Sequence, residues 1–224
     1  MSCNVLAKHD PNVLRRAVQT ALECADGVWY RYTLKRDVCG CALSGDEERT
    51  VVDSAVRTAD DMARRVIAKY GLLSPQELAE EMCLNVVHTA EELREPFLYM
   101  GLYKPDTRTI TLNDNAILLV RQFIGANGLD ALTPSDNITR ITLFHEIFHA
   151  LEEETPDIYT RSRMLERMVL GIFPYKRGLD GVSEVGAVHF SKCMAGVPYS
   201  PCIYEHYLLL ALDQLSIDFL PPDV

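Results

Sequence analysis

The five residues HEIFH, at positions 145–149, carry the side chains best suited to chemistry in this chain of 224 residues. On a helix, His145 and His149 leave the same face one turn apart. Their imidazole nitrogens can then bind one ion at about 2.0–2.1 Å, the usual zinc–nitrogen distance. Glu146 follows the first histidine and can reach a water molecule without binding the ion itself. A Lewis acid that acidifies water, beside a carboxylate that takes the proton, is what a metal-assisted hydrolase needs.

The surrounding residues favour this interpretation over two histidines that merely pack in a core. The five-residue pattern alone arises by chance in roughly one chain in a hundred of this length. The same segment also carries an apolar stripe at helical spacing, formed by Ile141, Phe144, Phe148 and Leu151. The two histidines lie off this stripe, whereas packed core histidines more often share it. The context therefore supports a zinc site.

A catalytic zinc needs a third protein ligand and one open position. No third histidine follows at the short spacing that some zinc hydrolases use, because Thr155 stands there. Glu184 is the preferred candidate, since it lies on a predicted helix. Gly186 and Ala187 on that helix are small enough for a close approach to the first helix. The alternatives are three other side chains, Glu152, Glu153 and His189.

Hydrophobic periodicity and capping signals predict the elements that position these residues. We expect helices over residues 11–25, 45–70, 75–83, 115–128, 182–194 and 205–215, and strands over residues 28–34, 84–87, 97–103 and 108–113. The segment from Thr133 to Asp136 has the pattern of a helix start and predicts where the HEIFH helix begins. Pro156 limits how far that helix extends. The connection KPDT predicts a hairpin between the last two strands.

Composition and charge exclude several other classes of protein. The net charge is −10, so phosphate backbones repel the chain and no direct nucleic-acid partner is expected. The N-terminus lacks the pattern of a signal peptide. The longest apolar runs, AILLV and YLLLAL, are too short to span a bilayer. We therefore expect a cytoplasmic protein with no membrane partner.

The seven cysteines are odd in number and form no compact framework, which is typical of reduced thiols. Cys39 and Cys41, with Cys3 and Cys24 upstream, are an alternative metal site. Free thiols are the preferred interpretation, because no second paired spacing exists.

Four segments occur in the order seen in the ImmA/IrrE-like metallopeptidases: AKYGLLSPQELAEEMCLNVVHTAEEL, YMGLYKPDTRTITLN, ITLFHEIFHAL and EVGAVHFSKCM. The chain resembles this family, a minimal gluzincin with an HExxH motif, over about residues 57–196. By this resemblance, His145, His149 and Glu184 would bind Zn²⁺ and Glu146 would be the general base. Known members cleave helix-turn-helix repressors in the cytoplasm. The resemblance thus implies a protein or peptide substrate such as a transcriptional repressor.

The chain departs from the family pattern at three places. Phe148 stands where glycine is usual, and Val188 where asparagine or aspartate is usual. In the family, the polar side chain at the position of Val188 would hold the free ring nitrogen of a ligand histidine. Valine cannot form that hydrogen bond, so we expect His189, a backbone carbonyl or water to supply it. The segment between the motifs, residues 155–181, is longer than usual. We expect it to hold a specificity element or to cover the cleft.

These observations predict an α+β fold in which a small, twisted, mostly antiparallel sheet packs on helices. The resemblance implies a zincin-like arrangement, with the HExxH helix beneath the sheet. We expect residues 1–56 to form a helical N-terminal extension and residues 57–224 to form the zincin-like metallopeptidase domain.

The expected function is that of a zinc-dependent endopeptidase. A substrate strand would add to the sheet edge at the predicted hairpin. Three tyrosines are candidates to stabilise the oxyanion, Tyr99, Tyr103 and Tyr159. One alternative is another zinc hydrolase, such as a deformylase. The segment GCALS at residues 40–44 is faintly similar to the cysteine motif of deformylases. An alternative of a different class is a catalytically silent interaction module with a zincin fold.

Overall fold

The structure, a computed structural model, describes residues 9–94, 98–169 and 173–219. Its helices are α1 (Pro11–Glu23), α2 (Asp26–Lys35), α3 (Gly45–Tyr70), α4 (Pro75–Glu81), α5 (Asp114–Ala126), α6 (Asn137–Glu153), α7 (Tyr159–Ser162), α8 (Asp180–Ala195) and α9 (Cys202–Ala211). The strands are β1 (Asn85–Thr89), β2 (Gly101–Lys104), β3 (Thr109–Asn113), β4 (Met164–Val169) and β5 (Phe173–Gly178). Short 3₁₀ turns cover Gly40–Ala42, Pro105–Thr107 and Ile217–Phe219. The predicted α+β class is confirmed.

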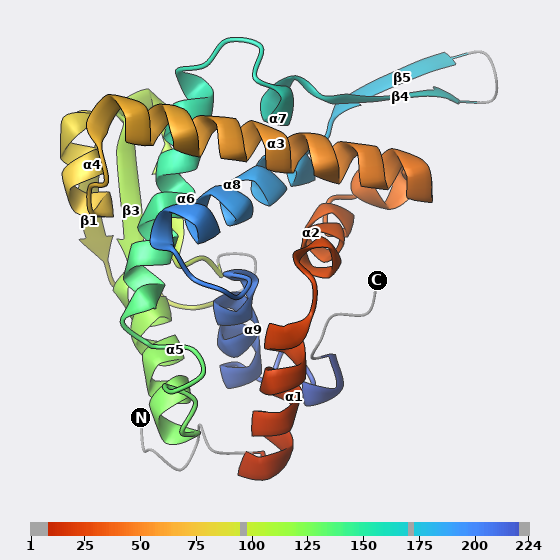
Figure 1. Cartoon of the computed structure of the whole chain (residues 1–224). Coiled ribbons are helices and arrows are strands. Elements are labelled where there is room, and N and C mark those ends of the chain that lie inside the picture. Colours follow the sequence, from red (N-terminus) through yellow and green to blue (C-terminus); the bar gives the residue numbers. More distant parts are fainter. Residues whose placement is uncertain (1–8, 95–97, 170–172, 220–224) are drawn as a thin grey trace.

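The sheet that lies against the helices is small and mixed. Its strand order is β1-β3-β2, with β1 parallel and β2 antiparallel to β3. The hairpin predicted around KPDT is confirmed, since this segment is the turn between β2 and β3. Strands β4 and β5 form a separate antiparallel hairpin that extends away from the helices (Figure 1). Antiparallel pairing thus accounts for two of the three described strand pairs.

Helix α6 lies between α8 and the sheet, where it contacts β2 and β3. Figure 1 shows it passing behind α3 and beside α8, with β3 on its other side. Most of its side chains are buried, including Phe144 and Phe148. It begins at Asn137, later than the predicted cap at Thr133. The buried Thr133 hydroxyl instead lies 2.9 Å from the Tyr207 hydroxyl, so it does not cap the helix.

The strand predicted over residues 28–34 is wrong, because this segment forms α2. Its residues Trp29, Tyr30 and Leu34 are buried in the core. Tyr30 and Leu34 are four apart and share one face of a helix. Burial of that face overrides the strand preference of the aromatic and β-branched residues.

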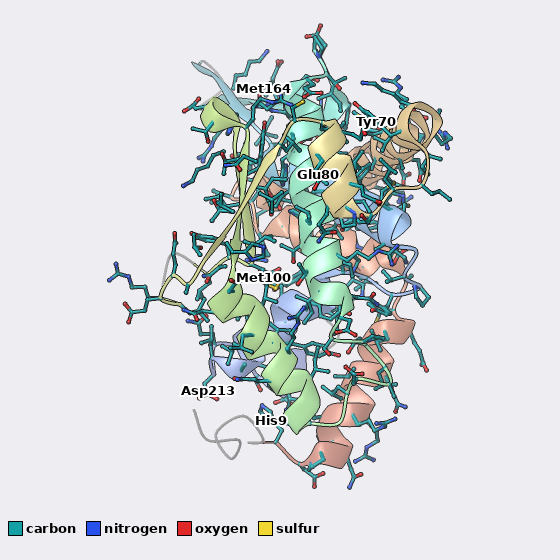
Figure 2. All side chains as sticks on the ribbon, turned by 90° about the vertical axis from the view of Figure 1, so that its left-hand side faces the viewer. His9, Tyr70, Glu80, Met100, Met164 and Asp213 are labelled. Carbon is teal, nitrogen blue, oxygen red and sulfur yellow. The ribbon has the colours of Figure 1, made fainter. Side chains whose placement is uncertain are left out.

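The N-terminal helices are joined to the rest of the molecule by α3. Ser44 and Glu47 form a capping box at its start, and Gly71, at φ 82°, ends it. The same box, from Ser74 and Glu77, starts α4 as predicted. Tyr70 and Glu80 mark these two helices in Figure 2. The boundary that we expect between residues 56 and 57 falls inside the continuous α3.

In the part of the chain that the structure describes, no helix has the length and apolarity needed to span a bilayer.

Candidate metal centre

Helices α6 and α8 approach each other closely enough to bring their polar side chains together. A Cβ atom placed on Gly186 would lie 2.7 Å from Cζ of Phe148, so only glycine fits at this point of α8. The large Phe148 is therefore accommodated by a glycine on the facing helix. This confirms that the small residue Gly186 permits the close approach.

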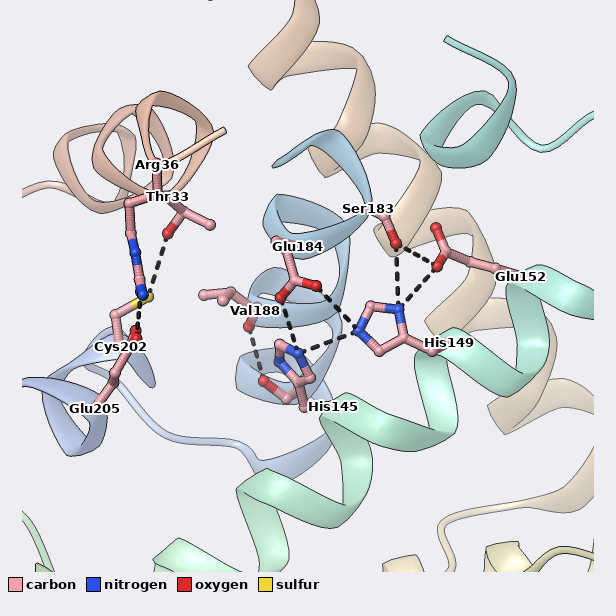
Figure 3. Close-up of polar contacts among 11 residues, drawn as sticks. Thr33, Arg36, His145, His149, Glu152, Ser183, Glu184, Val188, Cys202 and Glu205 are labelled. Carbon is pink, nitrogen blue, oxygen red and sulfur yellow. Dashed lines mark hydrogen bonds and ion pairs between the residues drawn. The ribbon is translucent and has the colours of Figure 1, made fainter. Parts of the chain in front are cut away.

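Three donor atoms from these helices converge, one each from His145, His149 and Glu184 (Figure 3). Nε2 of His145 lies 3.2 Å from Nε2 of His149. The Glu184 carboxylate places one oxygen 3.3 Å from Nε2 of His145 and the other 3.6 Å from Nε2 of His149. The two histidine side chains are about one-fifth exposed and that of Glu184 is half exposed. One side of the cluster thus faces solvent.

The donor set fits a zinc ion. Two imidazole nitrogens and one carboxylate oxygen are the ligands of a common class of catalytic zinc sites. Tetrahedral coordination at the usual bond lengths separates such ligand atoms by about 3.3–3.5 Å. The observed separations agree with this within a few tenths of an ångström. The exposed side of the cluster leaves room for a fourth ligand.

The second ring nitrogen of His149 is held by two neighbours. Nδ1 of His149 lies 3.0 Å from Oε2 of Glu152, and the Ser183 hydroxyl donates to the same carboxylate oxygen at 2.6 Å. Glu152 is buried, although it lies only one turn beyond His149 on α6. Its position assigns the Nδ1–H to this hydrogen bond and leaves Nε2 free to bind a metal. Glu152, an alternative third ligand in the sequence, therefore faces away from the converging donors.

The residue that holds the second ring nitrogen of His149 is Glu152, which is not among the substitutes expected for a polar group at Val188. Val188 is buried and lines the cleft described below. His189, one of the expected substitutes, instead lies 2.6 Å from the Tyr30 hydroxyl and 2.8 Å from Asp60. Glu152 instead holds the second ring nitrogen of His149. The signal for it was its spacing three residues after His149, at which helix side chains meet.

The electrostatic surroundings of His149 favour a charged imidazole when no ion is bound. Burial lowers the pKa of His149, but the hydrogen bond to Glu152 and the charge of Glu184 outweigh it and raise the pKa to about 9. A divalent cation would interact favourably with the same carboxylates. To bind Nε2 of His149 it would have to displace the proton of the charged imidazole.

Glu146 lies beneath β2 and beside the donors. It is 6% exposed. Burial raises the pKa of this carboxyl above its usual range, against the lowering effect of the two histidines. A Cβ atom on Gly101 would lie 2.8 Å from both Cγ and Oε1 of Glu146. Gly101 is therefore what lets β2 pass directly over the glutamate.

Two pockets lie beside the candidate metal centre, and several residues line both of them. The first has a volume of about 570 Å³ and the second about 560 Å³. Both are lined by Tyr99, Gly101, His145, Glu146, Asp180 and Glu184. They therefore form one cleft that passes across the candidate metal centre. The long segment 155–181 contributes five residues to it, Thr160, Arg161, Leu179, Asp180 and Gly181.

The remaining candidates from the sequence have other surroundings. Glu153 pairs with Arg161. Tyr99 and Tyr103 line the cleft, whereas Tyr159 packs against the core. Cys24, Cys39 and Cys41 are free thiols outside the two ligand groupings found among the described residues, and Cys3 lies outside those residues. Cys41 donates to the Lys35 carbonyl and does not line the cleft.

Comparison of the chain with models of protein families, with curated proteins and with solved structures finds no match.

Proposed function

We propose that this protein is a zinc-dependent endopeptidase of the HExxH type. The observation that carries the proposal is the convergence of His145, His149 and Glu184 at zinc-ligand separations. It is supported by the position of Glu146, which is next to the first ligand and lines the same cleft. A bound zinc ion would supply the Lewis acid that acidifies water and polarises the scissile carbonyl.

The protein's own residues supply the remaining functions. Glu146 takes the proton from the attacking water and gives it to the leaving amine. Glu152 and Ser183 fix the ring of His149, so that Nε2 points into the cluster.

A substrate strand is proposed to lie along β2. Among the described residues this strand pairs with β3 alone, so its other edge can bind a further strand. Gly101, Leu102 and Tyr103 of β2 all line the cleft, and Leu102 is 39% exposed. An extended peptide paired with this edge would cross directly over Glu146. This arrangement favours a polypeptide substrate over a small molecule.

Stabilisation of the oxyanion is proposed to come from a phenol of the cleft. Tyr99 and Tyr103 both line it, and burial raises the pKa of each. Each hydroxyl therefore keeps its proton at neutral pH and can donate a hydrogen bond to a developing negative charge. Tyr99 is engaged with Glu91, which leaves Tyr103 the preferred donor.

The proposed substrate is a cytoplasmic protein, with a helix-turn-helix repressor as the first class to test. To test the proposal, untagged and zinc-supplemented protein is incubated with mixed peptides and with repressors encoded beside its gene, and the products are identified by mass spectrometry. Glu146→Gln should keep its zinc and lose at least about 100-fold in cleavage rate, the usual effect of losing a general base. Glu154→Gln, a surface change near the end of the same helix, should cleave normally.

Cleavage that survives in Glu146→Gln would refute the assigned role of Glu146. Absence of cleavage by the zinc-loaded wild type, across peptides and repressors alike, would instead favour the silent interaction module.

A further inference from the structure

A second cluster of metal-binding side chains lies on another face of α8. Asp60 comes from α3, while His189 and Cys193 stand four residues apart on α8. Nε2 of His189 lies 2.8 Å from Oδ1 of Asp60 and 3.5 Å from Sγ of Cys193. The remaining separation, between Sγ and Oδ1, is 3.9 Å. The largest separation among the three ligand atoms is therefore 3.9 Å.

We propose that Asp60, His189 and Cys193 form a second metal site, which binds Zn²⁺ or a similar transition-metal ion. A thiolate, an imidazole and a carboxylate together suit zinc, which accepts sulfur, nitrogen and oxygen ligands. Tetrahedral coordination would place these atoms about 3.3–3.6 Å apart, so no separation needs to change by more than about 0.5 Å. Cys193 is exposed and the Asp60 side chain is 39% exposed, so an ion can enter from solvent.

The other nitrogen of His189 is held as it is in many metal sites. Nδ1 lies 2.6 Å from the hydroxyl of Tyr30 on α2, and the Tyr30 ring also contacts the imidazole edge-on. This contact fixes the ring with Nε2 toward Asp60 and Cys193. A hydrogen bond of this kind typically orients a metal-binding histidine and selects which nitrogen is free.

The charges around the cluster leave Asp60 available for an ion. Lys192, the adjacent cation on α8, is paired at 2.6 Å with Asp26. Partial burial and the nearby charge of Asp60 raise the pKa of the Cys193 thiol, which keeps its proton when no ion is present. Binding breaks the S–H bond, forms a sulfur–metal bond and releases the proton to solvent.

This site is distinct from the centre formed by His145, His149 and Glu184. Glu184 and His189 are five residues apart on α8, so their side chains point about 140° away from each other around the helix. The second site joins α3 to α8, whereas the first joins α6 to α8. A metal at the second site would therefore fasten to α3 the same helix that supplies Glu184. The proposal does not depend on peptidase activity.

Cobalt(II) provides a selective test, because only the second site contains sulfur. Untagged protein, kept reduced with a phosphine, is titrated with Co²⁺ and the near-ultraviolet absorption is recorded. Bound thiolate gives a sulfur-to-cobalt charge-transfer band, which imidazole and carboxylate ligands do not give. We expect this band in the wild type and in His149→Ala, which disables the first site. We expect it to disappear in Cys193→Ser and in His189→Gln.

Cys41→Ser is the matched control, since Cys41 is also an exposed thiol and belongs to neither cluster. It should keep the band at full intensity, and circular dichroism should show that all the variants are folded. Absence of the band in the wild type would overturn the proposal. So would a band that persists in Cys193→Ser, or one that is lost in Cys41→Ser or in His149→Ala.

Discussion

His149 and Glu152 are joined by a 3.0 Å hydrogen bond between Nδ1 and Oε2, one turn apart on the same helix. The carboxylate is buried and also accepts a hydrogen bond from Ser183 on α8. This pair fixes which nitrogen of His149 faces Glu184, and it also links α6 to α8 at the candidate metal centre. Removing Glu152 should therefore weaken metal binding without removing a ligand.

Glu152→Ala should lower zinc affinity by about 10–100-fold, the usual effect of losing the partner of a ligand histidine. Affinity is measured by competition with a chelator. Glu154→Ala, two residues further along the chain and exposed, should keep the wild-type affinity. Equal affinities for Glu152→Ala and the wild type would show that this hydrogen bond does not orient the ligand.

Val188→Asn adds a polar side chain to the lining of the cleft beside His145 and Glu184. Because Glu152 already holds His149, the added amide should change zinc affinity by less than about tenfold. The same chelator competition measures it. A much larger gain would mean that the native site lacks a needed hydrogen bond, which would favour the silent interaction module.

Gly101→Ala should distort the site, since the new methyl group would meet Glu146 at 2.8 Å and Thr142 at 2.7 Å. Crowding of this kind typically lowers the free energy of unfolding by about 1–3 kcal/mol. Gly125→Ala is the matched control, because no atom lies within 4 Å of its Cβ position inside α5. It should raise that free energy by up to about 1 kcal/mol. Urea denaturation measures both, and a Gly101→Ala protein as stable as the wild type would contradict the close approach of β2.

His206 should make stability depend on pH. It is fully buried beside Trp29, and burial lowers its pKa in the folded protein. Below about pH 6.5 the unfolded chain takes up a proton at this residue while the folded chain does not. Stability should therefore fall as the pH is lowered from 7.5 to 5.5, by at most about 1.4 kcal/mol per pH unit from this residue.

The measurement is urea denaturation of the wild type and of His206→Gln at both pH values. His206→Gln should be less stable overall and should lose less stability on acidification. An equal loss in the two proteins would show that His206 does not carry the effect.

The sequence predicts the features that depend on local geometry. The spacing of His145 and His149 follows from the helical repeat, and capping boxes and glycines predict where α3 and α4 begin or end. The strand predicted over residues 28–34 is wrong because packing decides the conformation of a segment rich in aromatic residues. The hairpin of β4 and β5 is not predicted, because residues 164–178 lack a clear alternation of apolar and polar side chains.

Contacts between distant segments explain the other omissions. Asp60 precedes His189 by more than half the chain, and the two meet only because α3 packs on α8. The role of Glu152 depends in the same way on Ser183, which comes from another helix. A single sequence carries no signal that Asp60 meets His189 or that Ser183 meets Glu152, because these contacts depend on how the helices pack.

The zinc content of untagged protein tests the central claim most directly. The comparison uses Cys193→Ser as the parent, because that change removes the thiolate of the second proposed site and any zinc then belongs to His145, His149 and Glu184. Elemental analysis should find about one zinc per chain in Cys193→Ser and less than about a tenth of that after His149→Ala is added. Zinc content that His149→Ala leaves unchanged would contradict the account.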